Sequence, residues 1–407
     1  MENFSEVMVI GGGPSGSFCA LNLAKKAVIV TVFEEHSEIG VPCHCAGHLS
    51  INGLKNLELY PLPKGIVENI FYGAKIYSPK GSSFSIRFSS PITCTVNRIL
   101  FDKYLSQLAE RAGASYLLGT RVESLARREE NVEVIASKED RKTIKFSGKV
   151  VVDAEGASCR ILRQAGLNPP KNFVYCVNAE VENVKDVEHD EVEVFLGNIY
   201  APGFYAWLIP KKEENAKIGL GTRTGNPKAL LKKFINKHPV ASRKLGKAKI
   251  LHKNYHIIPL GGPVKKAYSD RFIAVGDAAS HVKPTTGGGV ILGLNCARIA
   301  ADVVADAVRS GDLSAKSLEI YQKRLKNFLG FDMQVMLEIR KILGLMSDED
   351  INCFIEFCKK SFRENDFQNL RDLDFQGRLL IKALQKPKSV MVMAYLAALI
   401  FRNAFRL

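Results

Sequence analysis

The sequence lacks an apolar run long enough to cross a membrane, and it lacks a recognisable leader. A membrane span needs about 20 predominantly apolar residues, whereas the unbroken apolar run 390–401 has 12. The first residues, MENFSE, lead directly into the apolar VMVIGG without a basic region or a small-residue cleavage site. These absences predict a cytoplasmic protein. Basic residues on both sides of the run 390–401 also suit a helix that rests on a membrane surface, as an alternative to a buried helix.

Cysteine is sparse and odd in number, with 9 residues spread over 407. This pattern favours the reduced thiols of a cytosolic enzyme over a disulfide framework. With 407 residues, of which 46% are hydrophobic, the chain is long enough and apolar enough to form two or three domains with buried cores.

Acidic residues are in deficit, with 42 Asp and Glu against 57 Lys and Arg and a net charge of +15. Nucleic acid, anionic lipid head groups or diphosphates, and simple solubility could each account for this excess. The lysines are dispersed, and no helix-turn-helix, RNP-type or zinc-finger pattern occurs. Nucleic acid is therefore the least favoured partner.

A strand, a glycine-rich turn, a helix and a second strand open the chain. The apolar stretch 7–10 precedes Gly11, Gly13 and Gly16 in a GxGxxG pattern, and the second strand ends at Glu34. The glycines permit a tight turn and close approach of the backbone to a pyrophosphate at the helix N-terminus, and the carboxylate accepts from ribose hydroxyls. The segment predicts a dinucleotide-binding domain.

Three later motifs follow in a fixed order. Arg98 precedes a long helix, residues 153–156 read DAEG after a strand, and Gly276-Asp277 follows another strand. Together with the first turn they resemble the flavoprotein hydroxylase superfamily, although Glu155 stands where aspartate is usual. The resemblance implies bound FAD, with Asp277 at its ribityl side. No second GxGxxG follows a strand, so a built-in NAD(P)H domain is not expected. The resemblance also implies FAD contacts at Ser15, Val122, Gly288, Gly289 and Val290.

Residues 205–221, YAWLIPKKEENAKIGLG, form a narrower pattern. They read as a hairpin, and two aromatic rings on one face of a strand are as common in cores as in ligand slots. The tract is similar to the YxWxxP and GxG pattern of geranylgeranyl reductases. This resemblance implies that the following residues line an isoprenoid substrate: Tyr205, Trp207, Pro210, Gly219 and Gly221. It also places Pro284 and 287–289 in a turn that lets the alkene approach the flavin.

The stretch 40–50, GVPCHCAGHLS, carries two cysteines and two histidines. A zinc site would need a second ligand pair at a suitable spacing, and a disulfide between Cys43 and Cys45 would close a strained ring. Archaeal geranylgeranyl reductases have a similar loop beside the flavin, in which the residue matching Cys45 faces the substrate. The resemblance implies Cys45 as the catalytic residue, no metal, and FAD contacts at Cys45, Ala46, Gly47 and His48.

The expected fold is α/β. A Rossmann-type FAD-binding domain comprises 1–55, 95–165 and 265–317, and an inserted antiparallel sheet comprises 56–94 and 166–264. Residues 318–407 are expected to form a helical C-terminal domain, because apolar residues recur at helical spacing from about residue 318.

The resemblance implies an FAD-dependent reductase of isolated C=C bonds in digeranylgeranylglycerophospholipids, or in geranylgeranyl diphosphate, for archaeal membrane lipid synthesis. The electron donor would be external: ferredoxin, NAD(P)H or deazaflavin. Cys45, His48 and His281 are candidate proton donors, and the flavin itself or water could also serve. The alternatives are an FAD monooxygenase or halogenase, which shares the flavin motifs, and a non-enzymatic protein that binds lipid or nucleic acid.

Overall fold

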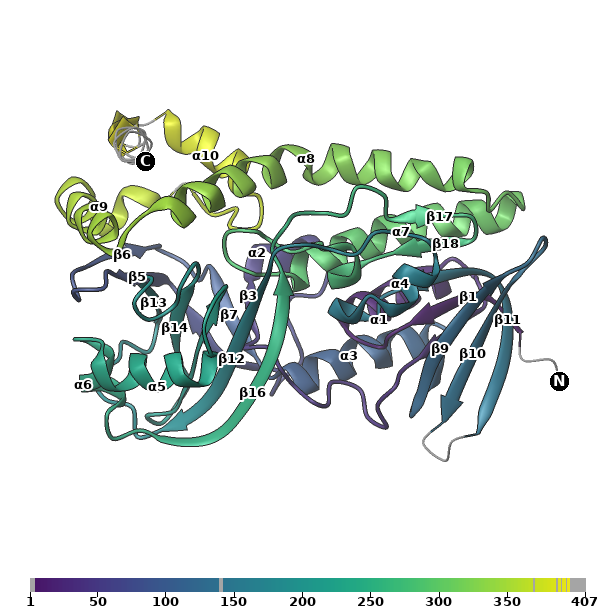
Figure 1. Cartoon of the computed structure of the whole chain (residues 1–407), viewed down its shortest axis with the longest axis horizontal. Helices are drawn as coiled ribbons and strands as arrows, with labels where there is room; N and C mark the ends of the chain where they lie inside the picture. The colour runs from purple at the N-terminus through teal and green to yellow at the C-terminus, as the bar shows by residue number, and fades with distance from the viewer. Residues whose placement is uncertain are drawn as a thin grey trace. The chain divides into compact units, whose positions relative to one another are not determined.

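The computed structural model describes residues 4–138, 142–368, 370–385, 387–388, 390–392 and 394–395 (Figure 1). The chain divides into two compact units. Unit 1 comprises Met1–Cys43, Arg98–Asn172 and Pro259–Met333, and unit 2 comprises His44–Asn97, Phe173–Ile258 and Gln334–Leu407.

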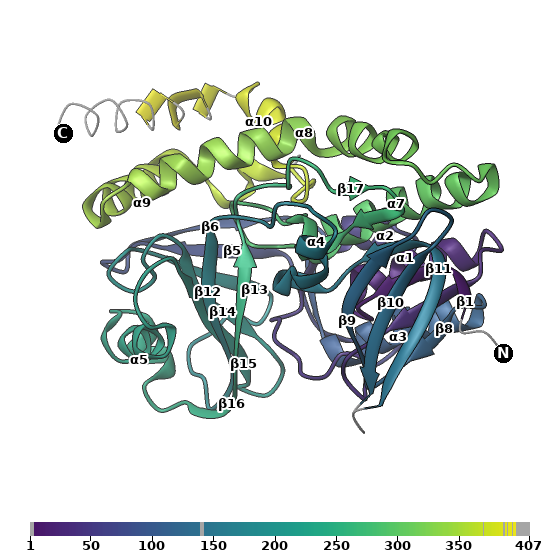
Figure 2. The same cartoon turned by 45° about the vertical axis from the view of Figure 1, so that its right-hand side comes forward.

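Unit 1 is built on a largely parallel sheet of the order β17-β18-β11-β1-β2-β8. Its strands are β1 (Phe4–Ile10), β2 (Val30–Phe33), β8 (Ser115–Leu117), β11 (Thr143–Asp153), β17 (Tyr268–Ser269) and β18 (Phe272–Ala274). The antiparallel strands β9 (Thr120–Arg127) and β10 (Val132–Lys138) join this sheet through β11, beside which they lie in Figure 2. The second half of β1 (residues 7–10) is an unbroken run of buried apolar side chains, and β2 is buried throughout, as expected for strands covered on both faces.

The helices of unit 1 are α1 (Pro14–Ala24), α3 (Arg98–Arg111), α4 (Arg160–Gln164), α7 (Val290–Ser310) and the first part of α8 (Ala315–Leu345). Two 3-10 turns accompany them, Gly156–Ser158 and Gly276–Ala279. Helix α1 packs against α7 and α3. It is buried over most of its surface, which fits its composition of small and apolar residues.

Unit 2 contains a seven-stranded sheet of the order β16-β12-β15-β14-β13-β5-β6. The strands are β5 (Gly73–Tyr77), β6 (Ser83–Arg87), β12 (Phe173–Glu182), β13 (Glu191–Leu196), β14 (Tyr205–Pro210), β15 (Ala216–Thr222) and β16 (Lys249–Pro259). Strands β12, β15, β14 and β13 pair in antiparallel fashion, and β13 pairs with β5 in parallel. A second sheet has the order β3-β7-β4, from β3 (His48–Ser50), β4 (Val67–Phe71) and β7 (Thr93–Val96).

The helices of unit 2 are α2 (Ile51–Asn56), α5 (Pro227–Lys237), α6 (Ala241–Leu245), α9 (Asp348–Ser361), α10 (Gln376–Leu384) and the last part of α8. Helix α5 packs against β12 and β15 (Figure 1). Asn226 caps its N-terminus through hydrogen bonds from the backbone of Lys228 and Ala229.

The two faces of the seven-stranded sheet differ in composition. Ala206, Leu208, Ile218 and Leu220 point to one face, where they form a buried core with Leu231, Phe234 and other side chains; we call it the helical face. The opposite face carries Cys176, Asn178, Tyr205, Trp207, Lys217, Gly219 and Gly221, as the strand register and alternation require. We call it the aromatic face.

The predicted α/β fold is confirmed: a parallel Rossmann-like sheet, a separate antiparallel sheet and C-terminal helices are all present. The unit boundaries differ from the expected domain boundaries. Strand β3 and helix α2 belong to unit 2, because β3 pairs with β7. The C-terminal helices do not separate as a third unit: residues up to Met333 join unit 1, and Gln334 onward joins unit 2.

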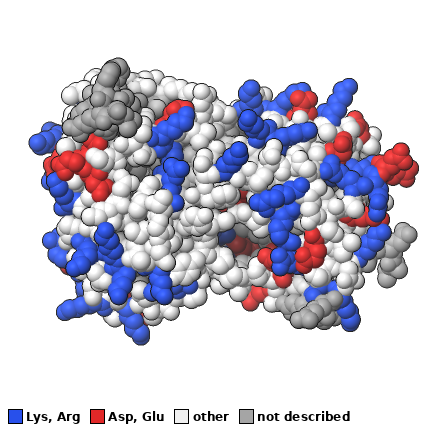
Figure 3. Space-filling view, viewed as in Figure 1, with Lys and Arg blue, Asp and Glu red and all other residues white. Residues whose placement is uncertain are grey.

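In the part of the chain that the structure describes, no helix has the length and apolar content to span a bilayer. Much of the apolar run 390–401, namely 393 and 396–401, lies outside the described residues. Lys and Arg side chains are spread over the face seen in Figure 3 and do not form a single patch. No disulfide links any of the 9 cysteines in the described part of the chain.

Candidate active site

The first glycine-rich turn of unit 1 is open on one side and closed on the other. A Cβ added to Gly13 would meet no atom within 4 Å, whereas one added to Gly16 would lie 1.9 Å from the carbonyl oxygen of Gly11. Gly13 is the N-cap of α1, and no side chain caps this helix. Free space therefore lies beside the uncapped N-terminus of α1, which suits the pyrophosphate of a dinucleotide.

Glu34 lies at the carboxyl end of β2, beside the same turn. Its Oε2 accepts a hydrogen bond from the backbone nitrogen of Gly12 (2.7 Å), and its Oε1 accepts from the backbone nitrogen of His36 (3.0 Å). The carboxylate is thus fixed where a ribose would follow the pyrophosphate.

Arg98 and Asp277 come from distant segments of unit 1 and are brought into electrostatic contact. Arg98, the first residue of α3, makes a bidentate ion pair with Asp102 at 3.0 and 2.9 Å. Burial raises the pKa of Asp277 to about 6, and the positive charge of Arg98 opposes this shift. A hydroxyl donor from a ribityl chain would stabilise the ionised form of Asp277, because hydrogen bonds to a carboxylate favour its charge.

The unusual Glu155 in the DAEG turn acts as a helix cap. Its Oε1 accepts from the backbone nitrogens of Ile161 (2.7 Å) and Leu162 (3.1 Å) in α4, and its Oε2 accepts from Ser158 Oγ (2.7 Å). The longer carboxylate thus links the DAEG turn to the start of α4.

The segment after Asp277 forms a tight turn before α7. The backbone of Gly287 donates to the carbonyl of Lys283 (2.9 Å), and Lys283 donates to the carbonyl of Gly288 (3.2 Å), with Pro284 between them. Gly289 is the N-cap of α7, and Val290 is its first residue; no side chain caps this helix either. The N-terminus of α7 is thus a second uncapped helix start in unit 1, and it is formed by Gly289 and Val290, two of the predicted FAD contacts.

His281 is held as a neutral imidazole. Its Nδ1 accepts from the backbone nitrogen of Gly276 (3.2 Å), and burial lowers its pKa to about 3. A neutral imidazole is a very weak acid, so the structure favours a packing role over proton donation. His48 is similarly engaged in unit 2, where its Nε2 lies 2.7 Å from Thr93 Oγ1.

The loop that carries Cys45 is held in place within unit 2. Cys45 Sγ accepts from the backbone nitrogen of Gly47 (3.4 Å), and Gly47 in turn accepts from the backbone nitrogen of Val96 (2.9 Å). Ala46 packs beside Trp207 against the small cluster of Phe71, Val192 and Ile209. Cys45 also lies near Cys176 and Tyr205 of the aromatic face. Burial is the main cause that raises the pKa of both groups, and electrostatic interaction with Cys45 raises each pKa further.

The aromatic face is shaped by two glycines. A Cβ on Gly219 would lie 2.4 Å from Cζ2 of Trp207, and one on Gly221 would lie 2.4 Å from Cδ1 of Phe204, so both rings lie flat over the strand. The rings of Tyr205 and Trp207 are 5.9 Å apart and meet edge to face. Trp207 Nε1 is buried without a hydrogen-bond partner in the described chain.

Lys217 is a buried cation that sequence reasoning did not identify. Its side chain is 4% exposed and donates to the carbonyl oxygens of Ala46 (3.1 Å) and Val96 (3.3 Å) and to Glu68 Oε2 (2.5 Å). Lys211 also pairs with Glu68, at 3.1 Å. The available signal was the alternation of a lysine with Gly219 and Gly221 along a strand whose intervening residues are apolar.

Two further predicted residues are Pro210 and Val122. Pro210 ends β14 on the face opposite Trp207, and its carbonyl accepts from Asn69 Nδ2 (3.0 Å). Val122 is buried in β9, and its carbonyl accepts from Arg160 (3.2 Å).

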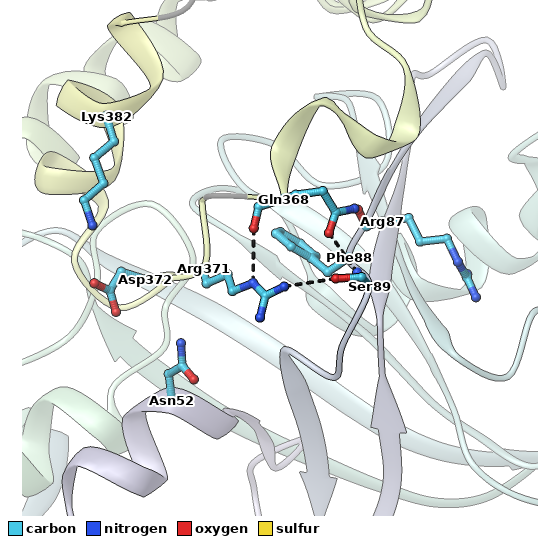
Figure 4. A pocket seen from close by; sticks show the side chains of 8 residues that line it. All are labelled: Asn52, Arg87, Phe88, Ser89, Gln368, Arg371, Asp372 and Lys382. Carbon is cyan, nitrogen blue, oxygen red and sulfur yellow. Dashed lines mark hydrogen bonds between the residues drawn. The ribbon is translucent and has the colours of Figure 1, made fainter.

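A cavity of about 840 Å³ in unit 2 is lined by none of the predicted site residues (Figure 4). Its lining is Asn52, Arg87, Phe88, Ser89, Gln368, Arg371, Asp372 and Lys382. The guanidinium of Arg371 donates to Ser90 Oγ (2.8 Å) and Ser89 Oγ (3.1 Å). The cavity therefore has a polar lining in which some side chains already hydrogen-bond to neighbouring residues. Within the described ranges, no three His, Cys, Asp or Glu side chains are placed to share a metal ion.

Comparison with known proteins gives consistent matches. Residues 5–328 match the family model described as FAD binding domain. A digeranylgeranylglycerophospholipid reductase of Methanocaldococcus jannaschii is 33% identical over 361 residues, which cover 88% of this chain and 91% of the relative. The reductase of the same name from Methanothrix thermoacetophila is 31% identical over 402 residues, or 96% and 99% of the two chains.

Two solved structures share the fold. A geranylgeranyl bacteriochlorophyll reductase-like protein from Thermoplasma acidophilum has a TM-score of 0.86 and 24% identity, covering 97% of this chain and 100% of its own. A flavin-dependent brominase has a TM-score of 0.66 and 19% identity, covering 88% and 100%. At these identities both likenesses concern the fold alone.

Proposed function

This chain belongs to the FAD-binding domain family and to its digeranylgeranylglycerophospholipid reductases, and from this membership we propose that it reduces isolated C=C bonds of geranylgeranyl chains with FAD. The most probative feature of the chain itself is the aromatic face beside the Cys45 loop. The substrate that we propose is a digeranylgeranylglycerophospholipid, as the relatives' names state for them.

The residues of unit 1 fit the cofactor. The open side of the turn at Gly13 and the uncapped start of α1 would hold the pyrophosphate, Glu34 the ribose, and Asp277 the ribityl chain. When bound and reduced, FAD supplies the hydride that an isolated alkene needs. The protein's own part is to place the alkene, exclude water and deliver a proton, because such an alkene has no carbonyl that an acid could polarise.

The aromatic face suits an isoprenoid chain. Tyr205 and Trp207 offer large rigid apolar surfaces that lose little rotamer entropy when a flexible chain packs on them. Gly219 lets the ring of Trp207 lie flat against the sheet, and Gly221 does the same for the neighbouring ring of Phe204. We infer that Tyr205 and Trp207 line the slot for the prenyl chain.

Cys45 is the proton donor that we favour. The two candidate histidines are engaged elsewhere, His48 with Thr93 and His281 with Gly276, and the low pKa of His281 keeps it neutral. Cys45 lies on a loop that Lys217 holds against the aromatic face. A thiol there would protonate the alkene carbon that does not receive the hydride.

We further propose peripheral contact with a lipid surface through α10 and the described residues 390–391. Ile381 (51%), Val390 (49%) and Met391 (57%) are exposed apolar side chains, and the basic Lys382 follows Ile381 in the sequence. An apolar face flanked by basic residues is typical of helices that lie in a membrane interface.

The decisive test is anaerobic incubation of the FAD-loaded protein with dithionite and a digeranylgeranylglycerophospholipid. We expect the lipid to gain the mass of two hydrogens for each reduced bond. An oxygen-dependent product formed with NAD(P)H would instead support a monooxygenase. Protein that stays colourless after FAD addition would refute both enzymatic functions.

A further inference from the structure

Two arginines of unit 2 converge on the turn that opens the aromatic strand β14. The guanidinium of Arg340, on α8, lies 5.0 Å from the ring centroid of Phe204. Arg223 follows β15, and its Cδ lies 2.9 Å from the position of a Cβ on Gly203, the neighbour of Phe204 in sequence. Two cationic side chains therefore cover two consecutive residues of one turn.

Neither arginine pairs with a carboxylate among the residues that the structure describes, and this sets them apart from the other arginine of the sheet. Arg87, for comparison, contacts both Asp190 and Glu191. Arg340 is half-buried, and its Nη2 is fully buried without a hydrogen-bond partner. Burial and the neighbouring charge of Arg223 lower the pKa of Arg340 to about 10, so it remains cationic at neutral pH.

This arrangement is costly unless an anion joins it. A guanidinium carries five N–H donors in a rigid fork, and a buried donor without a hydrogen-bond acceptor costs free energy. Repulsion between two cations adds to that cost. A phosphate would supply acceptor oxygens to the fork and negative charge to both side chains, which is the recognition for which arginine is best suited.

The arginine pair lies at one end of a row of aromatic rings. Phe204 stacks on Tyr205 with ring centroids 4.4 Å apart, and Tyr205 meets Trp207 at 5.9 Å. Tyr205 also interacts electrostatically with Arg340. A ligand with a charged head and a long apolar tail would match this order of groups.

We propose that Arg340 and Arg223 bind the phosphate head of the prenylated substrate and thereby fix how far its chain extends along Tyr205 and Trp207. This inference rests on the proposed function and names the part of the substrate that the protein recognises. The phosphate could belong to an ether glycerophospholipid or to free geranylgeranyl diphosphate, which share the same oxyanion chemistry.

Binding of inorganic diphosphate to the FAD-loaded protein tests the site without any turnover. By calorimetry we expect Arg340→Met to weaken binding at least tenfold and Arg223→Met to weaken it less, because Arg223 is the more exposed of the two. Lys341→Met is the matched control, since Lys341 is the next residue of α8 and pairs with Glu338 at 2.7 Å. Equal binding by wild type and Arg340→Met would overturn the proposal, as would equal losses in Arg340→Met and Lys341→Met.

A substrate comparison gives an independent readout. We expect the ratio of kcat/KM for geranylgeranyl diphosphate to that for geranylgeraniol to fall at least tenfold in Arg340→Met, and an unchanged ratio would contradict the proposal. Competition of each phosphorylated lipid against inorganic diphosphate tells which source of phosphate binds more tightly. If wild type reduces neither substrate, the proposed function fails, and calorimetry alone still decides the anion site.

Discussion

The two faces of the seven-stranded sheet in unit 2 are built from the same strands but carry different kinds of side chain. The helical face holds fully buried apolar side chains such as Leu208 and Ile218, packed with Phe234 of α5. The aromatic face carries Lys217, Asn178 and Cys176 among its rings and glycines, and two of its buried polar atoms, Asn178 Oδ1 and Trp207 Nε1, have no hydrogen-bond partner in the described chain.

The difference separates packing from binding. A buried polar group costs free energy unless it is paired. On the helical face the buried Glu193 of β13, which lies opposite Leu208, is held by an ion pair with Lys244, although its Oε2 has no hydrogen-bond partner in the described chain. The aromatic face accepts that cost, and Lys217 is tolerated only because Glu68 and two carbonyl oxygens surround its charge. The feature that distinguishes the aromatic face is the row of rings over glycines, with a lysine and a thiol among them, and this combination marks it as the side that binds a ligand.

The largest effect that would sharpen this contrast is expected at Cys45. Cys45→Ser should lower alkene reduction about 10³-fold, because an alcohol is a far weaker acid than a thiol and a positioned proton donor contributes 10²–10⁴-fold. The flavin absorbance of the variant should match wild type. Cys43→Ser serves as the control from the same stretch, and unchanged turnover in Cys45→Ser would remove this thiol from the mechanism.

On the helical face the loss should appear in stability. Leu208 is fully buried, so Leu208→Ala should reduce the free energy of unfolding by about 3 kcal/mol through lost burial and the cavity left behind. Urea denaturation measures this change. We expect the folded variant to keep its preference among substrates; a changed preference would break the assignment of this face to packing.

Asp277 extends the comparison to unit 1, because it too is a ligand-facing group whose burial is unfavourable. Its pKa of about 6 in the fold lies above the ordinary 3.8, so the FAD-free fold loses stability as pH rises from about 4 to 6. Asp277→Asn should therefore stabilise the FAD-free protein by about 2 kcal/mol above pH 6 and by little below pH 4. The same variant should bind FAD at least tenfold more weakly.

Thermal unfolding of the FAD-free protein across this pH range, together with titration by FAD, tests both halves of the Asp277 prediction. If Asp277→Asn is no more stable than wild type at pH 7, the ionised carboxylate does not lower the free energy of unfolding, and the prediction is wrong. A variant that retains full FAD affinity would contradict its place at the cofactor.

The smallest effect is expected at Lys217, which we regard as a positioning residue. Lys217→Met should lower alkene reduction about tenfold, because the carbonyl of Ala46 loses its partner and the Cys45 loop loosens. Alkylation of Cys45 by iodoacetamide, followed by mass spectrometry, should become faster. Lys211→Met is the control, since it removes the other cation from Glu68 but leaves Ala46 bonded; equal changes in both variants would assign the effect to the ion network instead.

Local patterns in the sequence predicted much of the fold. The turn at Gly11–Gly16 and the hairpin of β14 and β15 are determined by residues close together in the chain, so their spacing alone indicates them. Lys217 and Ala46 are separated by 171 positions, and Arg340 reaches Phe204 from another segment. Such contacts depend on how distant segments pack, which no local pattern records.

The cofactor residues were more accessible to sequence reasoning than those of the substrate. Glycine turns and an acid at a strand end each have a direct physical meaning in the sequence. The roles of Tyr205 and Trp207 came from the family resemblance, because two rings on one strand face are equally common in ordinary cores. The boundary at residue 43 could not be foreseen, since it depends on β3 pairing with β7.

The chain passes between the two units at residues 43, 97, 172, 258 and 333, so neither unit is a continuous piece of sequence. During synthesis, β1 must wait for β11 and then β18, which emerges only after residue 272, before the parallel sheet of unit 1 is complete. Such long separations between paired strands slow folding. The two units must therefore mature together on or after the ribosome, and a nascent chain stalled before residue 272 would expose the apolar edge of β11 to chaperones or to aggregation.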